Sequence, residues 1–439
     1  MKLETPHPIK SFRRRRARLA AVLGSGVAVM PTAPERTRNA DSHYDYRWDS
    51  GFYYLTGFRE PEAVLVIVAG KKPREILFCR EKNLEREIWD GFRYGPELAR
   101  EAFGFEEAYP YTELDARIPE LLADQDALHT PVGADPTWDT RVTGWLNAVR
   151  AKARAGVTAP SGIRDIRAAV NDMRLVKDEH ELAIMRKAAE ISCAAHVRAM
   201  GAAAPGRREY EIEAELVHEF CRNGARAPAY GSIVAAGANA CVLHYRENTA
   251  ELRRGDLMLI DAGCELHSYA SDITRTFPIG GRFSAVQRDV YELVLASQEA
   301  GIKAVKPGAD FIDYHDAATR VLVQGLIDFK LCKGSVAKVL EDGSYKQFYM
   351  HRTGHWLGLD VHDAGDYMRQ GKWRKLAPGM VLTVEPGLYI RPAPNVPKAF
   401  WNIGVRIEDD VLVTAKGREV LTSACPKTVR DVEAAVARR

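Results

Sequence analysis

The sequence has no long hydrophobic run and almost no excess charge of either sign. Its longest apolar run, at residues 63–69, is far shorter than the roughly 20 residues of a membrane-spanning helix. Lys and Arg number 62 against 59 Asp and Glu, so the formal net charge is only +3. Recognition of nucleic-acid phosphates usually needs a basic excess. We therefore expect neither a membrane segment nor a nucleic-acid partner.

The seven cysteines are odd in number and scattered, with no CxxC pair among them. This pattern is typical of reduced thiols in a cytoplasmic protein, which is the location we expect. Near the N-terminus, basic residues 13–16 precede an apolar stretch at 19–30, which loosely imitates a signal peptide. Gly24 and Gly26 interrupt that stretch, and no small-residue cleavage site follows before Pro31. We interpret it as a basic amphipathic helix that ends at glycine and leads into a strand.

The length of 439 residues suits two domains rather than one core. In the first 150 residues or so, strand-like runs alternate with helical stretches, which predicts an α/β domain. The strand-like runs are residues 63–68 and 75–79, and the helical stretches are 119–123 and 141–152.

A change of composition marks the end of this first region. Residues 153–162 are rich in Gly, Pro and Ala and form the best linker candidate. Further on, Asp178 and Glu181 form a capping-box pattern, an N-cap acceptor followed three residues later by Glu, which predicts a helix start. We place the boundary near residue 174, so the predicted domains are 1–174 and 175–439.

In the second domain, a pair of helices followed by strands is predicted twice. The first set comprises helices at 179–203 and 208–223 and strands near 230–235, 256–262 and 268–277. The second set comprises helices at 285–305 and 310–328 and strands near 380–390 and 403–413. This order indicates an α+β domain built from a duplicated αββ-type unit, although the internal identity is too weak to establish a repeat from the residues alone.

Four carboxylates lie within or at the ends of these apolar strands. They are Asp261, Asp272, Glu385 and Glu408. Charged carboxylates are almost never fully buried unless they are paired or bound to metal. Any one of them is explained more simply as a strand-end acid at the surface or in a salt bridge. All four together favour a functional site.

Histidines gather close to these acids in the sequence. His351, His355 and His362 are three of the 12 histidines of the chain. No glutamate follows His351 and Gly354 argues against a regular helix, so this is not the HExxH zinc motif. The four acids carry about four negative charges, which two divalent cations would balance, with one imidazole completing the set. Oxygen ligands with a single nitrogen favour Mn²⁺, with Co²⁺ or Zn²⁺ as alternatives, and two such metals can hold a bridging hydroxide and polarise a carbonyl.

Motifs across nearly the whole chain resemble one family. In the C-terminal half they are IDAGC at 260–264, SDITRTFP at 271–278, HWLGLDVHD at 355–363, PGMVLTVEPGLY at 378–389 and GVRIEDD at 404–410. In the N-terminal half they are DSHYDY at 41–46 and FYYLTGF at 52–58. The sequence is thereby similar to the bacterial Xaa-Pro aminopeptidase (aminopeptidase P) family, within the pita-bread metallopeptidase superfamily. The resemblance implies an N-terminal α/β domain followed by a pita-bread (creatinase/aminopeptidase) catalytic domain.

The resemblance also implies a site made of two divalent metal ions and five ligands. These are Asp261, Asp272, His355, Glu385 and Glu408. Asp272 and Glu408 are expected to bridge or chelate the metals, and His355 to bind one of them.

Four further residues match family positions in the substrate cleft. His244 corresponds to a histidine near the scissile bond, and His351 and His362 correspond to two others that line the cleft. Arg406 corresponds to an arginine beside the metals that fixes Asp261 or substrate.

The expected reaction is hydrolysis of the bond between the first residue of a peptide and a proline at position two. Glu385 would accept or relay a proton, while His244 and His362 would stabilise the oxyanion and position the substrate. Tyr367 or Trp89 could form walls of a proline pocket. Trp89 could act from a neighbouring subunit, and a plain surface or packing role is at least as plausible for it.

Three alternatives and two departures accompany this interpretation. Prolidase, which accepts only Xaa-Pro dipeptides, shares all five ligands; a non-enzymatic pita-bread binding protein would be expected to have lost ligands. Methionine aminopeptidase is disfavoured because it lacks a comparable N-terminal domain. Arg352 replaces a small residue of many relatives, and the loop at 366–375 is individual in composition, which leaves substrate preference open. By resemblance we expect a homo-oligomer, in the form of a tetramer.

Overall fold

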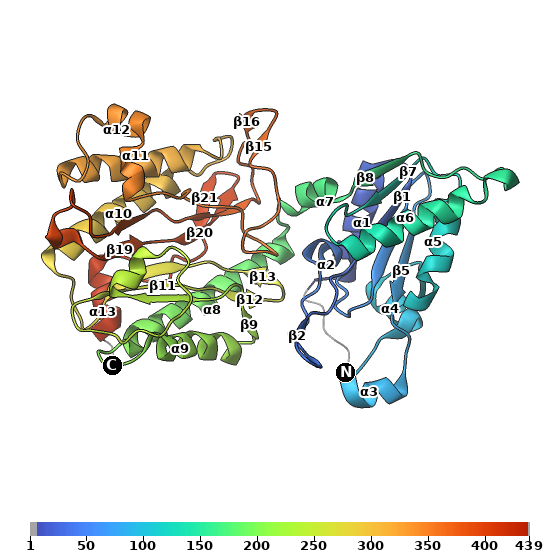
Figure 1. Cartoon of the computed structure of the whole chain (residues 1–439), viewed down its shortest axis with the longest axis horizontal. Helices are drawn as coiled ribbons and strands as arrows, with labels where there is room; N and C mark the ends of the chain where they lie inside the picture. The colour runs from blue at the N-terminus through green and yellow to red at the C-terminus, as the bar shows by residue number, and fades with distance from the viewer. Residues whose placement is uncertain (1–6, 438–439) are drawn as a thin grey trace. The chain divides into compact units, whose positions relative to one another are not determined.

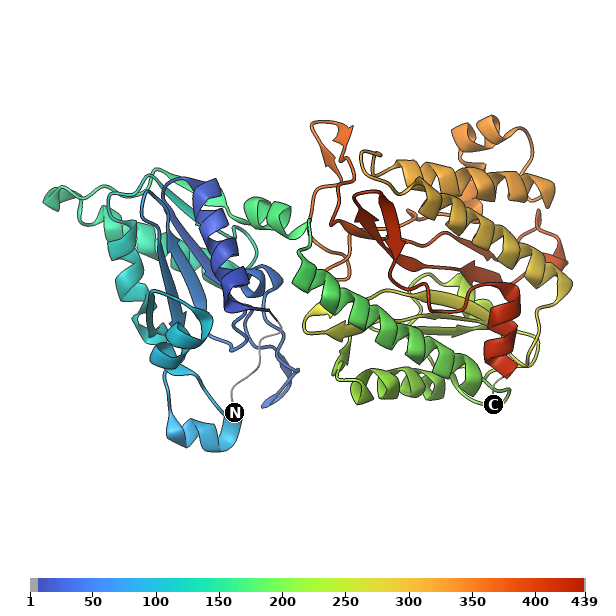
Figure 2. The ribbon, with the colours of Figure 1, turned by 180° about the vertical axis from the view of Figure 1, so that it is seen from behind.

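The computed structural model describes residues 7–437, which form two compact units (Figures 1 and 2). The first unit ends at Arg174 and the second begins at Leu175. No helix within residues 7–437 combines the length and the apolar character needed to cross a bilayer.

The first unit is a six-stranded mixed sheet flanked by helices, so the α/β prediction is confirmed. The strand order is β6-β5-β4-β1-β7-β8, and only β1/β4 and β4/β5 pair antiparallel. The strands are β1 (Val27–Pro31), β4 (Val64–Val68), β5 (Arg74–Cys79), β6 (Glu107–Pro110), β7 (Ala127–Thr130) and β8 (Gly162–Asp165). The helices are α1 (Ile9–Leu23), α2 (Ser50–Thr56), α3 (Leu84–Asp90), α4 (Gly95–Phe103), α5 (Leu114–Leu122), α6 (Pro136–Arg150) and α7 (Arg167–Arg174). A small hairpin joins β2 (Thr37–Asn39) to β3 (Ser42–His43).

Two local predictions in this unit have opposite outcomes. Helix α1 ends at Gly24, whose φ of +74° suits glycine and whose N–H donates to the carbonyl of Ala20, and β1 follows directly. The interpretation as a helix that leads into a strand is confirmed. The linker prediction for residues 153–162 is wrong, because this segment leads into β8, which pairs with β7 inside the same unit.

In the second unit, strands lie between two helix pairs (Figures 1 and 2). One pair is α8 (Glu179–Ala202) with α9 (Glu209–Arg222), and the other is α10 (Ala285–Ala304) with α11 (Asp313–Asp328). The capping box at Asp178 and Glu181 is present and begins α8, as predicted. Shorter helices are α12 (Val336–Asp342) and α13 (Val429–Ala437).

The strands of this unit form small separate sheets. Their orders are β10-β11-β14, β13-β12-β9, β17-β20-β21, β18-β19 and β15-β16. The bounds are β9 (Ala227–Pro228), β10 (Ile233–Ala236), β11 (Leu257–Asp261), β12 (Cys264–Leu266), β13 (Tyr269–Ala270), β14 (Thr274–Pro278), β15 (Met368–Arg369), β16 (Lys372–Trp373), β17 (Val381–Val384), β18 (Gly387–Ile390), β19 (Ile403–Arg406), β20 (Asp409–Thr414) and β21 (Gly417–Val420).

Three strands that the sequence predicts as continuous are broken in the structure. The breaks lie at Asp272, between β13 and β14; at Glu385, between β17 and β18; and at Glu408, between β19 and β20. The chain changes partners at the last two breaks, because β17 pairs with β20 whereas β18 pairs with β19. At each break the backbone N–H of the acid makes a hydrogen bond outside the regular strand pairing. Asp272 N–H donates to Asp410 Oδ2, Glu385 N–H to the carbonyl of Thr353, and Glu408 N–H to the carbonyl of Thr274. These breaks are where the chain turns carboxylates out of the apolar sheets.

Candidate active site

One cavity of about 1070 Å³ in the second unit collects the residues that the sequence selected. Its lining includes Asp261, Asp272, His355, Glu385 and Glu408 together with His244, His351, His362 and Arg406. The structure therefore brings together segments far apart in the chain.

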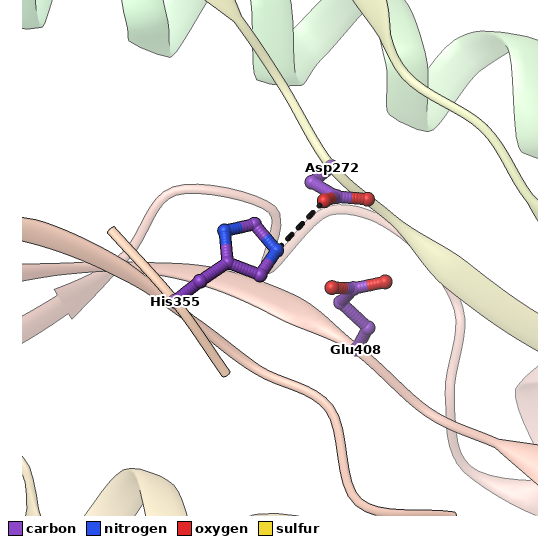
Figure 3. Close-up of side chains that lie close together, drawn as sticks. All are labelled: Asp272, His355 and Glu408. Atoms are coloured by element: carbon purple, nitrogen blue, oxygen red, sulfur yellow. Dashed lines mark ion pairs between the residues drawn. The ribbon is translucent and has the colours of Figure 1, made fainter. Parts of the chain in front are cut away.

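Three of the predicted ligands form the tightest cluster. Asp272, His355 and Glu408 each offer one ligand atom, and these atoms all lie within 4.8 Å of one another. In Figure 3 the imidazole of His355 points at Asp272, and the carboxylate of Glu408 lies beside both. His355 Nε2 is 3.4 Å from Asp272 Oδ2 and 3.7 Å from Glu385 Oε1. Four of the five predicted ligands are thus within a few ångströms of a common point.

Hydrogen bonds fix the orientation of His355. Its Nδ1 lies 2.9 Å from the carbonyl oxygen of Trp356, which requires the proton on Nδ1 and leaves Nε2 facing the acids. The backbone N–H of His355 donates to Thr383 Oγ1 at 3.1 Å. A histidine held in this way is a typical metal ligand, because the bond to Nδ1 sets the tautomer.

The fifth predicted ligand, Asp261, is held by Arg406 and Tyr230. Arg406 Nη2 donates to Asp261 Oδ2 at 2.6 Å, and the Tyr230 hydroxyl is 2.6 Å from Asp261 Oδ1. The same hydroxyl is 2.5 Å from Asp272 Oδ1, so Tyr230 lies between the two aspartates. Sequence reasoning missed Tyr230. Its only signal is its place just before β10, the strand in which Ile233 pairs with Asp261.

A hydrogen-bonded chain runs from Glu408 to His351. Thr274 Oγ1 donates to Glu408 Oε2 at 2.6 Å and accepts from Arg406 Nε at 3.0 Å. Arg406 Nη1 donates to the Tyr389 hydroxyl at 2.9 Å, which lies 2.9 Å from His351 Nε2. Thr274 and Tyr389 also escaped sequence reasoning as site residues, although both lie inside the motifs it used. This chain couples the orientations of an acid, an arginine and a histidine from separate segments.

The acids outnumber the cationic groups of the chain at this site. Burial and the neighbouring carboxylates raise the pKa of Glu408 well above its usual value. Burial also raises the pKa of Glu385, to about 7, against the opposing charges of His355 and Arg406. Burial disfavours the charged form of His355, but the hydrogen bond and charge of Asp272 outweigh it and raise its pKa to about 9. The site thus favours added positive charge, and its oxygen-rich donor set with one imidazole fits divalent cations.

The remaining predicted histidines lie on the same cavity wall or rim. Burial lowers the pKa of His351 to about 3, so it is neutral near pH 7, and its Nδ1 bonds to the carbonyl of Arg352 at 2.7 Å. The ring of His362 packs edge-on against His355 with centroids 4.4 Å apart. His244 lines the cavity.

The two aromatic residues considered for a proline pocket belong to different units. Tyr367 lines the cavity, and its hydroxyl accepts from the Trp356 backbone N–H at 3.4 Å. Trp89 lies on α3 in the first unit, is 83% exposed and is not among the residues that line this cavity. The exposure of Trp89 agrees with the interpretation of this residue as a surface side chain. That it contributes to the proline pocket of a neighbouring subunit stays a prediction.

Comparison with protein families defines the class of the molecule. Residues 183–415 match the model of metallopeptidase family M24, and residues 12–129 match the model of the aminopeptidase P N-terminal domain. The chain therefore belongs to metallopeptidase family M24, and its second unit is a pita-bread domain.

Individual relatives match it over nearly its whole length. The chain is 44% identical to the Xaa-Pro aminopeptidase of Escherichia coli strain K12, with 97% of each chain covered. It is similar in structure to aminopeptidase PepP of Pseudomonas aeruginosa, with a TM-score of 0.97, 48% identity and 99% of each chain covered. It is also similar to zinc-substituted E. coli aminopeptidase P in complex with product, with a TM-score of 0.96, 43% identity and 99% of each chain covered. These matches confirm the resemblance drawn from the motifs.

Proposed function

We propose that this chain is a metal-dependent Xaa-Pro aminopeptidase, which releases the N-terminal residue of peptides with proline at position two. The observation that carries this proposal is one cavity in which four buried or half-buried acids, His355 and three further histidines meet. Relatives named Xaa-Pro aminopeptidase share 43–44% identity over 97% of the chain, which favours this activity over a prolidase. All five predicted ligands are present, which argues against a non-enzymatic binding protein.

Two divalent cations are proposed to be held by the acids and His355. The ligand set is Asp261, Asp272, His355, Glu385 and Glu408. Four carboxylates against one imidazole favour Mn²⁺ over Co²⁺ or Zn²⁺, although one relative has been studied in a zinc-substituted form. When bound, such cations lower the pKa of water and polarise a carbonyl.

Side chains of the cavity supply the remaining steps. Glu385 lies on the cavity lining and is suited to accept a proton from the attacking water and return it to the proline nitrogen of the leaving group. Its Oε2 is 4.0 Å from His351 Nδ1. His244 and His362 are assigned to donate hydrogen bonds to the oxyanion, and Arg406 keeps Asp261 oriented.

Proline at position two needs a shaped apolar surface, because its ring has no N–H to donate. Phe311, Tyr367 and Trp373 line the cavity and pack on one another, with the ring centroids of Phe311 and Tyr367 4.8 Å apart and those of Phe311 and Trp373 6.5 Å apart. Such an aromatic wall offers a flat surface for a pyrrolidine ring. We assign the proline pocket to this wall; sequence reasoning identified only Tyr367.

The setting of the enzyme is also part of the proposal. All seven cysteines are free thiols, which fits a cytoplasmic location. A homo-oligomer, with four subunits as the expected number, follows from the family and is tested by light scattering.

The test is hydrolysis of an Xaa-Pro-Yaa tripeptide and the matching Xaa-Pro dipeptide by metal-stripped protein. Each assay is run without metal and with Mn²⁺, Co²⁺ or Zn²⁺. The proposal expects metal-dependent release of Xaa from the tripeptide, fastest with Mn²⁺, and slow cleavage of the dipeptide. Cleavage of the dipeptide alone would make the chain a prolidase, and bound metal without cleavage of either peptide would assign the cavity to another role.

A further inference from the structure

The cavity has opposite charge at two parts of its lining. The five predicted metal ligands include four carboxylates, whereas Arg352 and Arg246 also line the cavity and bring positive charge. Arg352 is exposed to solvent although it follows His351 directly in the chain. Two bound divalent cations would balance the four carboxylates, whereas the charges of the two arginines stay available to a peptide.

Within residues 7–437, no carboxylate lies within ion-pair distance of the Arg352 guanidinium. Among the described residues that line the cavity, the one acid outside the metal ligands is Asp366, which Arg369 Nε already holds at 3.0 Å and Arg374 Nη2 approaches at 3.8 Å. The charge of Arg352 acts to lower the pKa of Asp316, but the two side chains form no ion pair. The positive charge of Arg352 is therefore left for a ligand.

An aromatic ring holds the Arg352 guanidinium in place. The guanidinium carbon lies 5.3 Å from the ring centroid of Trp373, within the range of a cation–π contact. Trp373 belongs to the hairpin of β15 and β16, which projects from the second unit in Figures 1 and 2, and packs on Phe311. A guanidinium stacked on a ring keeps its N–H edge free for a carboxylate, with less side-chain entropy to lose on binding.

We propose that Arg352, stacked on Trp373, is a subsite for a peptide carboxylate on the side of the proline away from the scissile bond. This inference rests on the proposed function and names its preferred substrates: short peptides that end in a free carboxylate, or longer ones with Asp or Glu after the proline. The carboxylate of such a peptide complements the positive charge of Arg352.

The decisive experiment compares Xaa-Pro-Yaa tripeptides as free acids and as C-terminal amides, since amidation removes the terminal charge. For the wild-type holoenzyme we expect kcat/KM to favour the acid by about tenfold, mainly through KM, because the contact is remote from the reacting bond. In Arg352→Met this ratio falls to about one, and in Arg352→Lys it is kept in part. Raising the salt concentration lowers the wild-type ratio.

Two matched variants make the test specific. Lys372→Met removes one positive charge from the hairpin that carries Trp373, outside the cavity lining, and should keep the wild-type ratio. Arg246→Met removes a second cavity arginine, one that contacts none of the predicted metal ligands by hydrogen bond or ion pair; if it, and not Arg352→Met, abolishes the ratio, the assignment to Arg352 is overturned. A ratio near one in the wild type, or a full ratio in Arg352→Met, also overturns it. Absence of cleavage of every peptide by the wild type would instead refute the proposed function.

Two further arms identify the source of the carboxylate. Tri-, tetra- and hexapeptides are compared as acids and amides, and amidated hexapeptides carry Glu or Gln at position three or four. A preference that vanishes with length assigns the subsite to a C-terminal carboxylate. If the amidated hexapeptides with Glu are cleaved better than those with Gln, and Arg352→Met removes this difference, the subsite is assigned to an acidic side chain of the substrate.

Discussion

Two adjacent acids in the second unit lie in opposite electrostatic surroundings. Asp409 accepts from Arg275 Nη2 and from Lys427 Nζ, both at 2.7 Å, and these cations overcome the cost of burial and lower its pKa to about 2. Glu408, one residue earlier, faces the other acids of the cavity, and burial with their charges raises its pKa. Around Asp409 the chain supplies the positive charges itself. Around Glu408 it supplies fewer positive charges than acids, so cations from solution would be needed to balance them.

The two surroundings have different purposes. Arg275 is fully buried and also donates to the backbone carbonyls of Glu408, Thr274, Cys425 and Pro426, so the paired cluster ties several segments together. A buried ion pair that satisfies every donor holds the backbone in one arrangement. The cavity acids instead repel one another, which is tolerable because the surrounding hydrogen bonds fix them. Stability and function are therefore separable between neighbouring residues.

The largest effect is expected at the unpaired acid. Glu408→Gln keeps the shape and removes one charge, and we expect kcat/KM on an Xaa-Pro-Yaa peptide to fall by about 10³-fold or more, because metal-dependent stabilisation worth several kcal/mol is lost. Metal content measured on the same preparation should fall as well. The metal-free variant should be about as stable as the metal-free wild type, since burial and the neighbouring acids already favour the neutral form of Glu408 there and glutamine has the same shape. Full activity would contradict the metal assignment.

The paired acid should behave in the opposite way. Asp409→Asn leaves Arg275 and Lys427 without their carboxylate, and breaking such a buried pair costs about 3–5 kcal/mol of unfolding free energy. Denaturant unfolding of the metal-free protein measures this loss in the second unit. If Asp409→Asn were as stable as the wild type, the distinction between the two surroundings would be lost.

Removing metal should make stability depend on pH in a characteristic direction. Glu385 has its pKa raised from 4.5 to about 7 and His355 from 6.5 to about 9, so the folded protein keeps protons that the unfolded chain releases. The stability of the metal-free protein therefore falls as the pH rises from about 5 to 9. Asp409 acts in the opposite sense at lower pH, because its contribution is present above 3.8 and is lost as the pH falls through 2.

Thermal unfolding at pH 5 and pH 8, with and without Mn²⁺, measures this dependence. Added Mn²⁺ should stabilise the protein at pH 8, by about 2.7 kcal/mol at a hundredfold excess over Kd, and reduce the difference between the two pH values. A metal-free protein that is more stable at pH 8 than at pH 5 would contradict the account of the cavity charges.

The smallest effect is expected at Asp410. Burial raises its pKa well above the usual value, which favours the neutral carboxyl group, and its Oδ2 accepts the backbone N–H of Asp272. An asparagine can make the same bond, so Asp410→Asn should change the unfolding free energy by less than about 1 kcal/mol. A comparison of Asp410→Asn with Asp409→Asn in the same unfolding assay tests whether the loss of unfolding free energy depends on charge pairing rather than on burial of an acid.

Local patterns explain most of what the sequence could predict. The capping box at Asp178 and the glycine at the end of α1 are short-range signals, and both were placed correctly. The cavity acids were recognised because a carboxylate in an apolar run, such as Glu385 after Val381–Val384, contradicts its surroundings.

The failures come from contacts between distant segments. The alternation of side chains typical of a strand continues through Asp272 and Glu408. The local sequence therefore contains no signal that the strands break there. Tyr230 acquires its role only because β10 is placed beside β11. Residues 153–162 have the composition of any exposed connection, and only the pairing of β8 with β7 assigns them to the first unit.

The strand breaks also constrain the order in which the molecule can be made. Thr274 and Glu408, whose side chains meet beside the cavity, are 134 residues apart, and Glu408 follows nearly all of the second unit. A chain emerging from the ribosome at about 5–20 residues per second has made most of its helices before this acid is available. The cluster of Asp272, His355 and Glu408 therefore cannot be complete until the last part of the domain has been made. A cation that needs all three ligands would then bind only after segments from both halves of the domain have come together.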